Sequence, residues 1–244
     1  MPIQPTAPIG FIDGSLLPVV IIGGIILFAV GAYFGWKAEM KRREELAALA
    51  AEMGFSFDHE KDSSHDDRYA QFEIFRRGHS RVAFNTMQGQ IDLLGSSCDA
   101  TLGDFRYRVT RNSGKSSSTT TYRFSYLIVH LPWDCPPLLI RPEGIFDKVA
   151  GAFGFDDIDF ESEGFSRRFY VKSPDKRFAY DVLHPRMMEF MLASTPPMID
   201  LEDGAVCLSG GKKRWSVEVF RERIRLLEKF CELWPRHLLR DLES

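Results

Sequence analysis

LLPVVIIGGIILFAVGAYFGW, residues 16–36, decides how the rest of the chain is interpreted, because it holds twenty-one residues without a charge. As an α-helix it would span about 31 Å, which matches the hydrocarbon core of a bilayer, about 30 Å thick. Twelve of its residues are Leu, Ile, Val or Phe. Their transfer into lipid favours insertion by about 4–7 kcal/mol. The segment is predicted to be a transmembrane helix.

A buried core helix and a cleaved signal peptide both fit this segment less well. A helix buried in a soluble core rarely stays apolar around its whole circumference for this length. A cleaved signal peptide has basic residues before a shorter apolar run and an Ala-x-Ala site after it. Residues 1–15 contain no Lys or Arg, and no such site ends the run.

The basic residues around the span predict its orientation. None precedes it, and four follow it in the stretch KAEMKRR at 37–43. Positively charged flanks stay on the cytoplasmic side. We therefore expect residues 1–15 to form a short extracytoplasmic tail. The rest of the chain would lie in the bacterial cytoplasm, tethered to the inner membrane with the lipid bilayer as its partner.

Gly31 and Gly35 form a GxxxG pair within the span. Small residues at this spacing let two transmembrane helices approach closely. Glycine is also common in such helices for other reasons. The pair is a candidate homodimer face.

The bulk composition bounds the soluble part. The net charge is −3, with no clustered basic run of the kind that nucleic-acid binders carry, so no nucleic-acid partner is predicted. The cysteines lie too far apart for a CxxC motif and are expected to be reduced core thiols; they are Cys98, Cys135, Cys207 and Cys231.

The soluble part divides into three predicted segments. Residues 37–54 are expected to continue the helix up to a Gly54 C-cap. Residues 55–135 are β-rich, with alternating apolar and polar residues that predict an antiparallel meander of about four strands. The strands are expected at 72–75, 81–94, 103–110 and 120–131, with a loop at 111–119.

Residues 136–244 mix both kinds of element. A short strand is expected at 138–141, a hairpin at Asp203-Gly204, and a last helix that begins after Ser216 and ends or kinks at Pro235. Further helices are expected near 143–152, 163–168 and 175–193. The predicted class is α+β: an N-terminal transmembrane helix, then an antiparallel-sheet soluble domain with C-terminal helices.

Several blocks resemble a bacterial family of uncharacterised single-pass membrane proteins with a cytoplasmic α+β domain. They are FRRGHSRVAFNTMQGQ at 75–90, DFRYRVT followed by NSGKSSSTTT, LLIRPEGIFDK, and FGFDDIDFESEGFSRRF at 154–169. The blocks occur in the family's order over roughly residues 37–200. The resemblance implies the topology and the fold class, and it implies no activity.

The motifs that suggest chemistry are incomplete. GKS at 114–116 lacks the glycine five residues earlier that a phosphate-binding P-loop needs. The acidic run at 156–163 lacks the glycine and the final glutamate of a calcium loop. His59 and His65 lie in an acidic loop that no rigid element orders. No catalytic, cofactor-binding or metal-binding residue is predicted, and no cofactor is expected.

One basic surface remains a candidate for binding an anion or a partner. If the strands that carry them pair, the basic residues of two segments share a face; they are Arg76, Arg77, His79, Arg81, Arg106 and Arg108. The alternative is an ordinary solvated face of the sheet.

These observations predict a membrane-tethered cytoplasmic binding or assembly module that is not an enzyme, with an unidentified ligand and an unidentified protein partner. The alternative is a membrane-bound hydrolase. It would use the Cys98 thiolate with His79 or His130 as its base.

Overall fold

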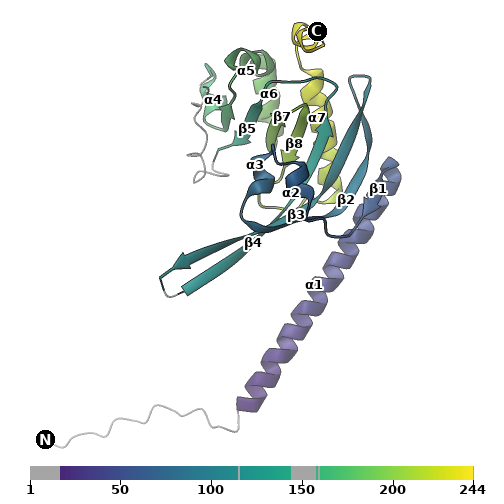
Figure 1. Cartoon of the computed structure of the whole chain (residues 1–244), viewed down its shortest axis with the longest axis vertical. Coiled ribbons are helices and arrows are strands. Elements are labelled where there is room, and N and C mark those ends of the chain that lie inside the picture. Colours follow the sequence, from purple (N-terminus) through teal and green to yellow (C-terminus); the bar gives the residue numbers. More distant parts are fainter. Residues whose placement is uncertain (1–16, 115, 144–157, 159, 244) are drawn as a thin grey trace, which may run out of the picture. The chain divides into compact units, whose positions relative to one another are not determined.

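The computed structural model describes residues 17–114, 116–143, 158 and 160–243. The chain divides into two compact units, Met1–Glu44 and Glu45–Ser244. Helix α1 (Leu17–Met53) contributes to both (Figure 1). The tail at 1–15, Leu16 and most of the helix expected at 143–152 lie outside the described residues.

The first unit consists of the apolar part of α1. Its most apolar window has a mean hydropathy of 2.2, and none of that window is buried by protein. Within the described part of the chain, this helix is long and apolar enough to cross a membrane. Exposure on all sides agrees with a lipid-facing span and not with a core helix.

The second unit is built on one antiparallel sheet of eight strands in the order β1-β2-β3-β4-β8-β7-β5-β6 (Figure 1). The first four strands are β1 (Ser56–Asp58), β2 (His79–Leu93), β3 (Ser96–Ser113) and β4 (Ser116–His130). The second four are β5 (Leu138–Pro142), β6 (Phe169–Lys172), β7 (Met198–Glu202) and β8 (Ala205–Ser209). β4 and β8 join the two halves.

Helices cover the two faces unequally, and each face has its own core. The larger core packs the end of α1 and five C-terminal helices against one face, with Leu46, Phe178, Met187 and Leu227 among its members. These helices are α4 (Glu163–Ser166), α5 (Lys176–Val182), α6 (Pro185–Ser194), α7 (Val217–Glu232) and α8 (Arg236–Leu242). The smaller core lies on the other face, where α2 (His65–Arg68) and α3 (Glu73–Arg76) cover Phe105, Phe124 and Tyr126.

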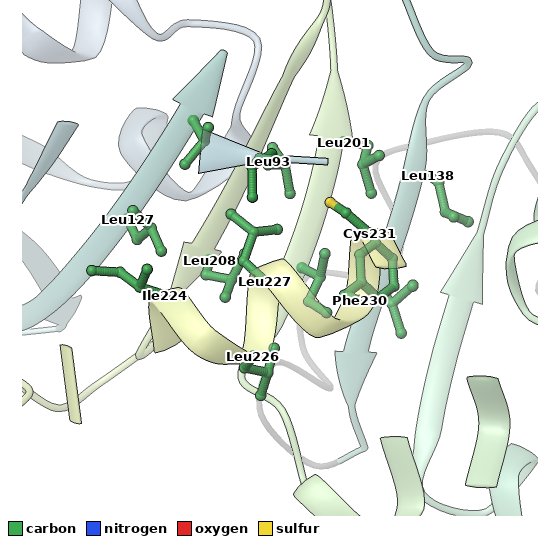
Figure 2. Packing of buried hydrophobic residues seen from close by; sticks show 14 of the residues in the cluster. Leu93, Leu127, Leu138, Leu201, Leu208, Ile224, Leu226, Leu227, Phe230 and Cys231 are labelled. Atoms are coloured by element: carbon green, nitrogen blue, oxygen red, sulfur yellow. The ribbon is translucent and has the colours of Figure 1, made fainter. Parts of the chain in front are cut away.

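Helix α7 shows how sequence spacing produces the larger core. Ser216 caps the helix by accepting a hydrogen bond from the Val219 amide, as its position predicts. Apolar residues then recur every three or four positions, and the side chains of Ile224, Leu227 and Phe230 point onto the sheet (Figure 2). The free cysteines are all buried in the cores, which confirms their prediction as reduced core thiols.

The α+β class is confirmed, and three predicted elements are corrected. FEIF at 72–75 is not a strand: Glu73–Arg76 form α3, because Phe72 and Phe75 bury the same side of one helical turn. The loop expected at 111–119 is largely strand, with its turn at Gly114. The helix expected at 175–193 is broken by Pro185, and His184 caps the second piece.

Truncation of Leu227 tests the role of the larger core. Leu227 is fully buried, so Leu227→Ala should lower the free energy of unfolding by about 2–5 kcal/mol. Leu94 is 43% exposed, so Leu94→Ala should change it by less than about 0.5 kcal/mol. Urea unfolding of the full chain in detergent, followed by tryptophan fluorescence, measures both. Equal effects would contradict this assignment of the core.

Candidate functional site

The predicted basic surface is split by the fold between two faces of the sheet. Along β3, Phe105 and Tyr107 belong to the smaller core, so Arg106 and Arg108 point to the opposite face. His79 pairs with Arg108 and lies on that same face, because its ring contacts Thr110. Three of the six predicted residues are therefore brought together.

An arginine that was not among the predicted residues completes this group. Arg123 on β4 lies directly opposite Arg106. Burial and the neighbouring charges of Arg108 and Arg123 lower the pKa of the Arg106 guanidinium. No described carboxylate forms an ion pair with any of the three. We call Arg106, Arg108 and Arg123 the arginine face.

The other three predicted residues lie beside α2 and α3. Arg77 pairs with Glu73 at 3.1 Å, and Arg81 pairs with Asp66 at 2.6 Å. Arg76 is exposed at the end of α3. Arg77 and Arg81 thus have partners within the fold, and the Arg81–Asp66 pair joins α2 to β2.

The arginine face leads onto a two-stranded ribbon. β3 and β4 pair without a register shift from Ala100–Val129 to Ser113–Ser116. β2 pairs with β3 only as far as Arg108, and β8 pairs with β4 only from Tyr126 onward. The hairpin between Val109 and Tyr122 therefore extends beyond its neighbouring strands (Figure 1).

A buried carboxylate fixes the base of the ribbon. Asp104 is fully buried and accepts hydrogen bonds from Ser125 Oγ at 2.7 Å and Asn85 Nδ2 at 3.2 Å. Arg214 lies 3.8 Å from the same carboxylate. Ser125 Oγ also accepts from the Trp215 amide at 2.8 Å. Three strands and the segment before α7 thus meet at one charged group, next to the arginine face.

A cleft on the opposite face contains groups that the sequence analysis missed. It has a volume of about 320 Å³ and lies between α3 and strands β5, β6 and β7. Asp200 lines it and is only 7% exposed. Burial and the nearby Glu202 and Glu73 carboxylates raise the pKa of Asp200 to about 8. Alternation along β7 places Asp200 and Glu202 together, but the sequence did not indicate which face α2 and α3 cover.

The histidine and cysteine candidates do not form a reactive site. His65 is buried among Tyr69, Phe75 and Tyr126, and burial lowers its pKa to about 3. Cys98 faces the larger core, whereas the His130 ring lies beside Tyr69 of the smaller core. Cys98 pairs with Ile91, twelve residues along β2 from His79. Burial also raises the Cys98 pKa, which disfavours the thiolate.

The raised pKa of Asp200 predicts a pH-dependent stability. Between pH 4 and pH 8 the folded state holds a proton that the unfolded chain releases, so this group lowers stability as pH rises. His65 has the opposite effect below about pH 6.5. We therefore expect the stability advantage of Asp200→Asn over the wild type to increase from pH 6.5 to 8.5. Thermal unfolding of the full chain measures it.

The control is Asp67→Asn, which removes an exposed carboxylate from α2. Its melting temperature should run parallel to that of the wild type over the same pH range. If Asp200→Asn also ran parallel, Asp200 would already be ionised in the folded protein.

Comparisons with known proteins point to a fold. No protein-family model matches the chain, and a search of curated proteins found no match. Among solved structures, the crystal structure of the mycobacterial trehalose monomycolate transport factor A is similar, with a TM-score of 0.52 and 12% identity. The match covers 78% of this chain and 93% of that one. At this identity, the likeness concerns the fold alone.

Proposed function

We propose that the chain is a single-pass membrane protein whose soluble domain is a binding or assembly module, without catalysis of its own, in a lipid-transport machinery. The domain would lie in the cytoplasm of a bacterium, with the N-terminus outside. The fold likeness to a trehalose monomycolate transport factor supports the lipid-transport setting. The resemblance to the bacterial single-pass family is part of the same proposal.

The observation that carries this proposal is the exposed apolar stretch of α1, joined almost directly to a folded domain. None of its most apolar window is buried. Eight residues separate Trp36 from Glu45, so the chain keeps the start of the domain within about 30 Å of the end of the span. A module on so short a tether samples only the membrane surface and the proteins embedded there, which raises its effective concentration for them.

The arginine face and the ribbon are the surface that we assign to a partner. The three guanidinium groups have no described carboxylate partner, so an acidic surface would relieve their mutual repulsion. The ribbon leaves backbone donors and acceptors unpaired along both outer edges, and a two-stranded hairpin is only marginally stable alone. Together these features favour a protein partner with an acidic docking face.

The hydrolase alternative loses its proposed residues. The fold places Cys98 and His130 on opposite faces of the sheet, and His79 lies far along β2.

Dimerisation through Gly31 and Gly35 stays a proposal. A side chain added at either glycine would meet no described atom within 4 Å, so both positions leave room for a second helix.

Topology can be tested by thiol labelling, because the four native thiols are buried. We expect a membrane-impermeant maleimide to label Thr6→Cys in intact spheroplasts. It should label Ser117→Cys, at an exposed position of the ribbon, only after lysis. The wild-type chain provides the background. Labelling of Ser117→Cys in intact spheroplasts would reverse the proposed orientation.

The partner surface can be tested by photo-cross-linking in native membranes. Thr121 lies opposite Arg108 on the arginine face, so a benzoyl-phenylalanine at this position should give a discrete protein adduct. The double variant Arg108→Glu/Arg123→Glu should reduce its yield by at least about fivefold, because it replaces attraction with repulsion.

The control carries the same charge change elsewhere: Arg225→Glu/Arg240→Glu alters two exposed arginines on α7 and α8. It should leave the adduct yield unchanged. Adducts only to lipid or to a second copy of this chain would contradict a distinct protein partner, and so would equal losses in the two double variants.

A further inference from the structure

The cleft beside Asp200 has the features of a ligand site. Its walls come from α3 and from the ends of β5, β6 and β7. Its volume of about 320 Å³ lies in the range of small-molecule pockets, roughly 300–1,000 Å³. Apolar and charged side chains both line it, and none of them belongs to the arginine face; they are Ala70, Gln71, Glu73, Arg76, Pro137, Leu138, Leu139, Lys172, Ser173, Pro174, Asp200 and Glu202.

Asp200 is an unpartnered polar group at the floor of this cleft. On the sheet it lies between Leu139 of β5 and Cys207 of β8, which are its cross-strand neighbours. The groups that affect its ionisation act through burial and charge, and no described residue hydrogen-bonds its carboxyl. A buried carboxyl without a partner is unfavourable in a folded protein. A ligand that donates hydrogen bonds to it would remove that penalty.

The charges around Asp200 indicate what the ligand carries. Glu202 follows two residues later on the same face of β7, and Glu73 faces the cleft from α3. Arg77 of α3 is already paired with Glu73. The floor is therefore acidic. Arg76 lines another wall, on α3, so a cationic group faces an acidic substituent.

We propose that this cleft binds a small zwitterion, with its ammonium group on Asp200 and Glu202 and its anionic group on Arg76. Leu139 and the two prolines would contact the carbon atoms between these groups. A phosphoethanolamine group has this chemistry, either as a free metabolite or as a lipid headgroup. The inference does not depend on the proposed partner surface, which lies on the other face of the sheet.

The direct test is calorimetric titration of the full chain in a non-ionic detergent with O-phosphoethanolamine. We expect saturable binding that Asp200→Asn weakens by at least about tenfold, since a hydrogen bond to a charged group contributes about 1.5–3 kcal/mol. Because burial raises the pKa of Asp200 to about 8, binding of an ammonium group should also release protons, measured from buffers of different ionisation enthalpy. The charges of Glu73, Arg77 and Glu202 act on the ionisation of Asp200, and Cys207 is its cross-strand neighbour on β8.

Matched variants and ligands separate the contribution of the ligand's ammonium group from that of its anionic group. Arg76→Gln should weaken phosphoethanolamine at least about fivefold and leave ethanolamine unchanged, because ethanolamine lacks the anion. Asp67→Asn should bind as the wild type does. Thermal unfolding confirms that each variant is folded. Equal binding by wild type and Asp200→Asn would overturn the proposal, and so would the absence of heat with every ligand tested.

A third arm distinguishes the source of the ligand. Dihexanoyl phosphatidylethanolamine binding more tightly than phosphoethanolamine would support a lipid headgroup. Tighter binding of the free compound would support a metabolite. Tighter binding of dihexanoyl phosphatidylcholine, whose methylated nitrogen donates no hydrogen bond, would overturn the assignment of Asp200 as an acceptor.

Discussion

The pairing of β3 with β4 is the interaction on which the rest of the domain depends. It runs in one register from Ala100–Val129 to Ser113–Ser116, while β2 shifts register against β3 in two places. This hairpin lies at the centre of the sheet, because β2 pairs with β3 on one side and β8 pairs with β4 on the other. Its constant alternation also assigns every side chain along it to one of the two faces.

That alternation explains how one hairpin contributes to both cores and also holds the arginine face. Near the middle of the sheet its side chains fill both cores, with Leu102 on one face and Phe105 on the other. Further along, the same face that held Leu102 presents Asp104 and then Arg106. Asp104 is stabilised by hydrogen bonds from Asn85 and Ser125 and by an ion pair with Arg214, so the charged part of the strand begins from a fixed point. The arginine face is therefore held by the core and does not lie on a loose loop.

Sequence patterns predicted the parts whose physics is local. The apolar span, the Ser216 cap and the Asp203-Gly204 turn each depend on neighbouring residues, and the structure has the corresponding elements. The strand predicted for FEIF at 72–75 was wrong, because four residues rich in Phe and Ile are compatible with a strand as well as with a helical turn. Only the packing of Phe72 and Phe75 under the sheet decides between them.

The candidate sites were predictable only in part, because they depend on pairing between distant segments. Arg106 and Arg108 could be placed on one face from alternation alone. Arg123 joins them only through the register of β3 with β4, which no local pattern fixes. Asp200 was even less predictable from local sequence. In the sequence it is one acidic residue in a hairpin, and its burial depends on α3, more than a hundred positions away.

The uninterrupted register of the ribbon has a consequence for how such proteins can diverge. Deleting or inserting one residue in each strand would move every side chain beyond that point to the opposite face of the ribbon. Deleting or inserting two residues in each strand would leave the side chains on their original faces. Between Val109 and Tyr122 no third strand constrains the pair. The reach of the hairpin can thus vary in steps of about 7 Å without disturbing the sheet.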